Sequence, residues 1–198
     1  MLWVNPYLYN CICINMVDYL KTGFESLDTH TSGYPIGDLS MIEGELDGML
    51  LKWSKSVTDK YNCIVASDYR HKNILKKQLD ITDESINDEI LHDTEIISDV
   101  VDKDTDVILF ESDSIPKLHK FIQYAEDNDI AVIVVSNEPN IELLSSSAFI
   151  MHEMQIQNQE NRTYKLVVKK DIYTGLSDDM IYDVTYNPYP KLEATERL

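Results

Sequence analysis

The sequence predicts one α/β domain with a mostly parallel β-sheet. Short, continuously apolar runs alternate with segments of helical spacing, which is the pattern of strands buried on both faces of a parallel sheet. After residue 145 the apolar residues recur at every second position, which is typical of antiparallel strands with one face in the core. A chain of 198 residues suffices for one such domain and is too short for two of ordinary size.

The individual elements follow from these periodicities. The expected parallel strands are the apolar runs at 39–43, 61–66, 107–110 and 130–135. Helical spacing predicts helices at 49–57, 72–79, about 94–101 and 115–128. Alternation predicts antiparallel strands at 149–157, 163–169 and 180–186. The expected architecture is therefore a mostly parallel sheet flanked by helices, with antiparallel strands at its C-terminal edge.

The two ends of the chain lie outside this pattern. We expect residues 1–19 to form an N-terminal arm, residues 20–189 the core, and residues 190–198 a flexible tail. The arm is apolar but interrupted by Asn and Pro, and it has neither a basic leader nor a small-residue cleavage site. A signal peptide or a membrane span is therefore not expected there, and the arm is the segment we expect to contact a partner.

Composition restricts the classes of partner. The formal net charge of −18 comes from 35 acidic and 17 basic residues, so the average surface repels nucleic acid and anionic lipid. A solvated acidic surface is the simplest interpretation. Three cysteines, without the paired spacing of a zinc site or the density of a disulfide scaffold, favour a reducing cytoplasm.

Two glycine-containing motifs precede the first apolar strand. Residues 22–28 read Thr-Gly-Phe-Glu-Ser-Leu-Asp, and residues 33–37 read Gly-Tyr-Pro-Ile-Gly. Their order and spacing resemble the segment T-G-x-x-x-L-D, G-G-x-P-x-G and strand that precedes the phosphate-binding loop of RecA- and RadA-type recombinases. The resemblance extends more faintly over residues 20–187, and it implies a RecA-like ATPase core.

Later segments resemble the other nucleotide motifs of that family. Glu111 and Ser112 end an apolar strand where the family has Asp-Ser. Asp68 lies where the family carries its catalytic Glu, and Asn137 and Glu138 lie where it carries an Asn-Gln sensor. The resemblance makes these positions vestigial acidic and sensor positions.

The phosphate-binding loop itself departs from the family pattern. A working loop needs G-x-x-x-x-G-K-[ST], in which backbone N–H groups surround the phosphates, Lys reaches the β and γ groups, and the hydroxyl binds Mg²⁺. This chain has Gly44, Glu45, Leu46, Asp47, Gly48, Met49 and Leu50. The spacing is one residue short, Met49 replaces Lys, Leu50 replaces Ser or Thr, and two acids add repulsion. We therefore expect a pseudo-ATPase with no catalytic residues and no cofactor.

The segments that would hold DNA in a RecA-type protein are short here. They correspond to residues 112–116 and 138–145, and the span 111–147 has Lys117 and Lys120 as its only cations. Direct binding of nucleic acid is therefore not expected.

Other chemistry has little support in the sequence. The five histidines are scattered without metal-ligand spacing, and no nucleophile elbow is present. Asp68, Glu111 and Asp113 could meet at the carboxyl ends of parallel strands and bind a cation, or they could be remnants of the fold.

The expected function is that of a catalytically inactive RecA-like accessory protein in DNA recombination, repair or replication. Its partner would be a recombinase or another RecA-like subunit, with self-association as a further mode. One alternative is an acidic inhibitor or decoy of a DNA-binding protein. Another is a divergent nucleotide-binding ATPase that uses Asp68 and Glu111. The expected location is the cytoplasm, or the host cytoplasm if the source is a phage or another virus.

Overall fold

The computed structural model describes residues 18–44, 47–157, 162–175, 180–186 and 190–194. The strands are β1 (Tyr19–Leu20), β2 (Tyr34–Pro35), β3 (Leu39–Gly44), β4 (Cys63–Ser67), β5 (Val107–Glu111), β6 (Ala131–Ser136), β7 (Phe149–Gln157), β8 (Arg162–Asp171), β9 (Met180–Tyr186) and β10 (Pro190–Ala194). The α-helices are α1 (Glu25–Asp28), α2 (Asp47–Thr58), α3 (Lys72–Leu79), α4 (Ile97–Val100), α5 (Leu118–Asn128) and α6 (Ile141–Ser146). Two short 3₁₀ helices are η1 (Asp88–Leu91) and η2 (Thr94–Ile96).

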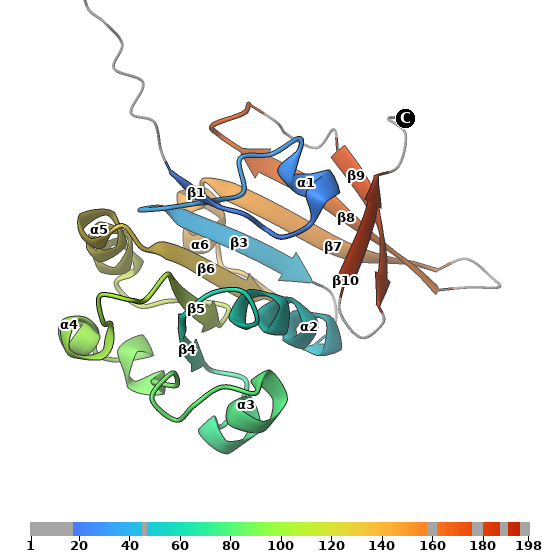
Figure 1. The fold of residues 1–198 in the computed structure, drawn as a ribbon. Coiled ribbons are helices and arrows are strands. Elements are labelled where there is room, and N and C mark those ends of the chain that lie inside the picture. The colour runs from blue at the N-terminus through green and yellow to red at the C-terminus, as the bar shows by residue number, and fades with distance from the viewer. Residues whose placement is uncertain (1–17, 45–46, 158–161, 176–179, 187–189, 195–198) are drawn as a thin grey trace, which may run out of the picture.

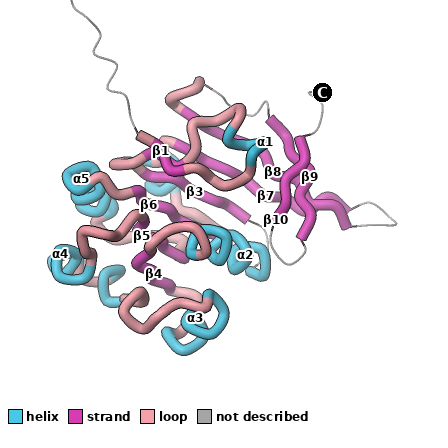
Figure 2. The backbone as a smooth tube through the Cα atoms, viewed as in Figure 1, coloured by secondary structure: helices cyan, strands magenta, loops and turns pink. Residues whose placement is uncertain are grey.

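The described strands form one large sheet and one small one (Figures 1 and 2). The large sheet has the order β10-β9-β8-β7-β3-β6-β5-β4. From β7 to β4 all neighbours are parallel, whereas β8, β9 and β10 add antiparallel strands on the C-terminal side. The predicted fold class is therefore confirmed. β1 and β2 form the separate antiparallel pair.

Four details differ from the expectation. β7 is parallel to β3 on one side and antiparallel to β8 on the other, so it joins the two kinds of sheet. Residues 190–194, expected within a flexible tail, form β10 and pair with β9. The segment 138–145, expected as a short loop, contains most of α6. The helix expected at 94–101 is divided into η2 and α4.

Helices cover both faces of the large sheet (Figure 1). On one face α1, α2 and α3 bury Leu27, Trp53 and Leu75. On the other face α4, α5 and α6 bury side chains that include Phe121 and Leu143. This two-sided burial explains why the parallel strands read as continuous apolar runs. No helix in the described ranges has the length and apolar composition that crossing a membrane requires.

The first glycine motif forms a closed local unit. The Asp28 carboxylate accepts hydrogen bonds from the Thr22 N–H at 2.8 Å, the Thr22 hydroxyl at 2.7 Å and the Gly23 N–H at 3.1 Å. Gly23 has a φ of +84°, and Leu27 is fully buried. The sequence T-G-x-x-x-L-D is therefore accounted for by contacts within the segment and with the core.

The second motif is also structural. Gly33 has a φ of +98°, and a Cβ there would lie 2.5 Å from the carbonyl oxygen of Leu20. Gly37 has a φ of +75°, and its N–H donates to the carbonyl of Ile130 at 2.9 Å. Both positions require glycine because L side chains rarely adopt this backbone conformation.

Candidate functional site at the carboxyl edge of the sheet

The strands β3, β4, β5 and β6 end at one edge of the sheet. In register, Glu43 pairs with Ser136, Ser67 with Glu111, and Glu111 with Val135. Parallel α/β sheets bind ligands outside the carboxyl ends of their strands. The fold thus brings the sequence-predicted positions on these strands to the edge where a ligand would lie.

The segment that resembles a phosphate loop runs from β3 into α2. Glu45 and Leu46 lie outside the described residues, and Asp47–Met49 begin α2. Leu50, which stands where a loop would place its metal-binding hydroxyl, is 1% exposed and belongs to the core. A Cβ at Gly44 would lie 3.1 Å from Leu50 Cδ2, so the two residues are closely packed. This position supports the helix against the sheet and offers no oxygen ligand.

Glu111, at the end of β5, is fully buried, and the side chains of Arg70, Ser54 and Ser67 interact with its carboxylate. Arg70 forms a salt bridge with it and donates hydrogen bonds from Nε at 2.9 Å and from Nη2. The hydroxyl of Ser54 on α2 donates to the same carboxylate. We refer to Ser54, Arg70 and Glu111 as the Glu111 cluster.

Electrostatics explains why this carboxylate needs its partners. Burial raises the pKa of Glu111, while the charge of Arg70 and the hydrogen bond from Ser54 act in the opposite direction. An unpaired buried carboxylate would be costly, so the guanidinium is the counter-ion that makes this burial tolerable. In the Glu111 cluster the guanidinium of Arg70 supplies the positive charge next to the buried carboxylate.

A tight turn after β4 positions Arg70. The Ser67 hydroxyl accepts hydrogen bonds from the N–H groups of Tyr69 at 3.1 Å and Arg70 at 3.0 Å. Asp68 N–H donates to the Glu111 carbonyl at 3.0 Å, and Ser67 N–H donates to the Asp88 carboxylate at 3.1 Å. The backbone of the turn is thus fixed against β5, and Arg70 points back toward Glu111.

A second polar cluster surrounds Asp113. Its carboxylate accepts hydrogen bonds from the Tyr69 hydroxyl at 2.5 Å, the Ser136 hydroxyl at 2.6 Å and the Glu138 N–H at 2.9 Å. Tyr69 also donates to the Asn137 side-chain oxygen at 3.3 Å. Burial would raise the pKa of Asp113, but these hydrogen bonds outweigh it and the pKa is lowered. Asn137 and Glu138, the positions that the resemblance predicts as a sensor, thus contact Tyr69 and Asp113 and link the ends of neighbouring strands.

The remaining predicted acid is also engaged. The Ser112 hydroxyl donates to the Asp68 carboxylate at 2.5 Å, although Asp68 is otherwise exposed. The chain brings Asp68, Glu111 and Asp113 to one edge, but within the described ranges no three His, Cys, Asp or Glu side chains are placed to hold a metal ion.

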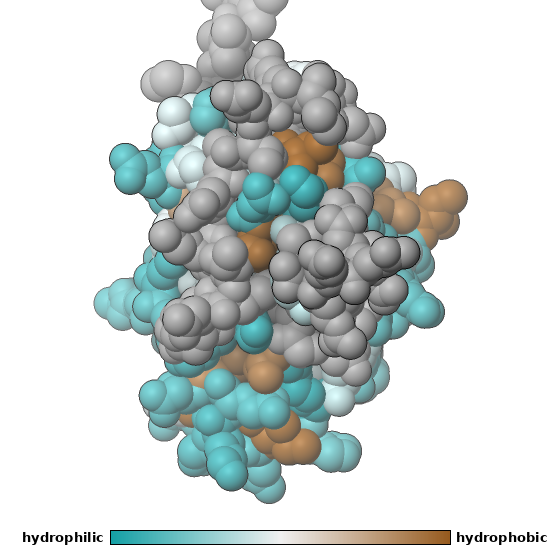
Figure 3. Space-filling model, turned by 90° about the vertical axis from the view of Figure 1, so that its right-hand side faces the viewer, coloured by the Kyte–Doolittle hydropathy of each residue, from teal (hydrophilic) through white to brown (hydrophobic). Residues whose placement is uncertain are grey.

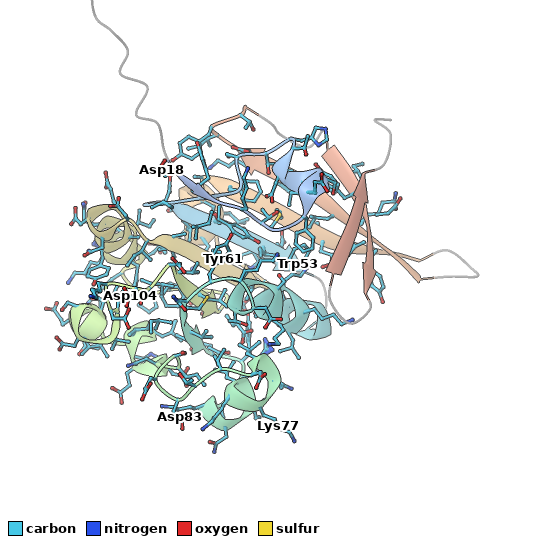
Figure 4. All side chains as sticks on the ribbon, in the orientation of Figure 1. Asp18, Trp53, Tyr61, Lys77, Asp83 and Asp104 are labelled. Carbon is cyan, nitrogen blue, oxygen red and sulfur yellow. The ribbon has the colours of Figure 1, made fainter. Side chains whose placement is uncertain are left out.

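Two functional-looking contacts were missed by sequence reasoning. Arg70 was not singled out, because one arginine after a strand carries no motif. The buried carboxylate of Glu153 on β7 accepts a hydrogen bond from the indole Nε1 of Trp53, which projects from α2 toward the sheet (Figure 4). Glu153 follows Phe149 and Met151 at every second position of this strand, so a charged residue in line with buried apolar ones was the one available signal.

The sequence was compared with known proteins. No protein-family model matches it, and no curated protein matches it either.

Proposed function

We propose that this chain is a catalytically inactive RecA-like accessory protein that acts through protein contacts in DNA recombination, repair or replication. The observation that carries the proposal is the Glu111 cluster. The acid that the RecA resemblance assigns to the second nucleotide motif is fully buried and bound to Arg70 and Ser54.

Three further features support a loss of nucleotide chemistry. Leu50 is part of the core where a magnesium-binding hydroxyl is needed. Met49 supplies no positive charge for the β and γ phosphates. Glu138 is exposed near the same edge and adds negative charge where the family has a neutral Gln. Each of these features is unfavourable for binding Mg-ATP, which supports a role through protein contacts.

Ligand-dependent thermal stability tests the inactive state. The full chain is heated with Mg-ATP, Mg-ADP, a non-hydrolysable analogue or single-stranded DNA, and an active P-loop ATPase serves as the positive control. We expect no change in the midpoint. A nucleotide at a hundred times its dissociation constant would add about 2.7 kcal/mol of stability, so a clear shift with nucleotide would refute the proposal.

The accessory role needs a test of its own. An active RecA-type recombinase is assembled on single-stranded DNA with increasing amounts of this chain, and filament length and ATP turnover are measured. We expect filaments to be shortened or stabilised in proportion to the added chain. The same filament length and turnover at every ratio would argue against a recombinase as the partner.

The distribution of acids favours a second candidate, an acidic inhibitor of a basic DNA-binding protein. Eleven of the 35 acidic residues lie in residues 80–106, and most of them are exposed. This segment borders β4 at one edge of the large sheet. Competition with single-stranded DNA for a basic DNA-binding protein would test it, and displacement of DNA that weakens with salt is the expected sign.

A further inference from the structure

A basic helix lies beside an acidic segment at the β4 edge of the molecule. α3 contains Lys72, Lys76 and Lys77 within eight residues and no acid. Residues 80–106, which follow it, contain eleven acids and Lys103 as their one basic residue. Lys77 and Asp83 lie on the same lower side and point away from the sheet (Figure 4). Hydrophilic side chains dominate the lower part of the face in Figure 3, with some apolar ones exposed among them.

The outer face of α3 has few partners in the monomer. Leu75 and Leu79 bury the inner face, whereas Lys72 and Lys77 are exposed and form no hydrogen bond or ion pair with any described residue. Ile74, between the lysines, is 44% exposed. Lys76, on the same helix, forms an ion pair with Asp83 at 2.7 Å. An exposed apolar side chain next to cations, two of them without an ion pair, is typical of a contact surface, because burial of the apolar group favours binding and the charges select an acidic partner.

One charge of α3 is unfavourable to its own dipole. Lys72 begins the helix, where the N-terminus already carries partial positive charge and no acid lies in the first turn. At the other end Lys76 and Lys77 lie in the last turn, where positive charge favours the helix. Lys72 is therefore the lysine of α3 whose position the helix dipole does not explain.

The acidic segment next to α3 presents a fixed surface. The N–H of Val65 on β4 donates to the Ser85 carbonyl at 2.8 Å, and the N–H of Asn87 donates to the Val65 carbonyl at 2.9 Å. These bonds attach residues 85–87 to the sheet as a short parallel bridge. Glu84 and Glu89, on either side of the bridge, are exposed and form no ion pair within the described ranges. The backbone next to both side chains is therefore fixed against the sheet, and the carboxylates lie at defined positions on the surface.

We propose that this edge mediates self-association, with α3 of one copy contacting residues 84–89 of a second copy and the reverse contact made across a two-fold axis. Adjacent patches of opposite charge become self-complementary when one copy is rotated by half a turn against another. The net charge of −18 repels the copies at a distance. At about 0.15 M salt, however, charges separated by more than about 8 Å are largely screened from each other. The charges of the local patches, and not the net charge, then determine whether two copies associate. This proposal does not depend on whether residues 44–50 bind a nucleotide.

Charge reversal in trans tests this surface. Sedimentation velocity of the full chain is measured from low to high micromolar concentration for the wild type, for Lys72→Glu/Lys77→Glu, and for Glu84→Lys/Glu89→Lys. We expect the wild type to form a dimer that weakens with salt. Each double variant should weaken the dimer by about ten-fold or more, because each places like charges across the two-fold axis. An equimolar mixture of the two variants should recover a dimer, since opposite charges then meet again.

The mixture also controls for folding, since only folded variants can complement each other. Lys21→Glu/Lys169→Glu makes the same change in net charge at exposed lysines away from this edge and should leave the dimer unchanged. A wild-type chain that stays monomeric at all concentrations would overturn the proposal. So would a dimer that the α3 variant leaves intact, or variants that fail to complement each other when mixed.

Discussion

Arg70 binds both carboxylate oxygens of Glu111, a residue 41 positions further along the chain, at the carboxyl end of the neighbouring strand. Because Glu111 has no exposed surface, this salt bridge is the contact that permits a charge inside the domain. It also links the turn after β4 to β5. At this edge of the sheet the Glu111 carboxylate is therefore engaged by a side chain of the same protein.

Removing Arg70 should destabilise the domain. In Arg70→Gln the Glu111 carboxylate loses its counter-ion, and we expect a loss of about 3 kcal/mol in the free energy of unfolding at neutral pH. Burial already raises the pKa of Glu111, and without Arg70 it rises further. The carboxyl therefore becomes protonated as the pH falls, and the loss should shrink toward acidic pH. Urea unfolding between pH 5 and pH 8 measures this.

A double variant provides the control for that prediction. In Arg70→Gln/Glu111→Gln no buried charge remains, so part of the lost stability should return and the pH dependence should disappear. If Arg70→Gln alone is as stable as the wild type at pH 7, Glu111 does not depend on this counter-ion.

Asp28 should be essential to the first motif. In Asp28→Ala, the N–H and hydroxyl of Thr22 and the N–H of Gly23 lose their shared acceptor. We expect a loss of about 2 kcal/mol in the free energy of unfolding, measured by urea denaturation. Asp59→Ala, at an exposed acid on the same face of the sheet, is the comparison and should change stability by less than about 1 kcal/mol.

Asp113 should contribute to acid sensitivity. Hydrogen bonds from Ser136, Tyr69 and Glu138 lower its pKa against the effect of burial, so the folded state favours the charged form. Stability from this group is present above the ordinary Asp pKa of about 3.9 and is lost as the pH falls through the lowered value. Because Asp113 is partly exposed, the effect should stay below about 1 kcal/mol. Asp113→Asn should flatten the dependence of unfolding free energy on pH in this range.

Introducing a hydroxyl at residue 50 should not produce nucleotide binding. In Leu50→Thr we expect a loss of about 2 to 3 kcal/mol in the free energy of unfolding, because a buried isobutyl group that contacts Gly44 is replaced by a smaller polar one. Calorimetric titration with Mg-ATP should give no heat of binding. Binding by this variant would mean that residue 50 alone had been limiting.

Sequence periodicity was enough to predict the parallel strands and α3, whose bounds are those of the prediction. Burial on both faces leaves an unbroken apolar run, so β3, β5 and β6 were visible in the sequence. Alternation marked β7 as a strand and indicated antiparallel pairing, which holds for β8. It could not reveal that β7 is parallel to β3, because alternation reports which faces of a strand are buried and only indirectly the direction of its neighbours. β10 was missed because prolines and polar residues around it read as a tail.

The candidate site was less predictable than the fold. Strand ends were placed by their order along the chain, which brought Asp68, Glu111 and Asp113 to one edge. The partner of Glu111 depends on how a turn directs one side chain, Arg70, across to the next strand. Hydrogen bonds from the Tyr69 and Arg70 N–H groups to the Ser67 hydroxyl fix the turn that orients Arg70. The spacing of residues in the sequence does not predict this orientation.

The Asp28 contacts have a consequence for how such a chain can diverge. Thr22 and Gly23 bond to Asp28 and make no use of a nucleotide. A chain under selection only to fold would keep this segment, because the contacts of Asp28 serve the fold alone. A match to this segment therefore reports on folding, and it says nothing about hydrolysis.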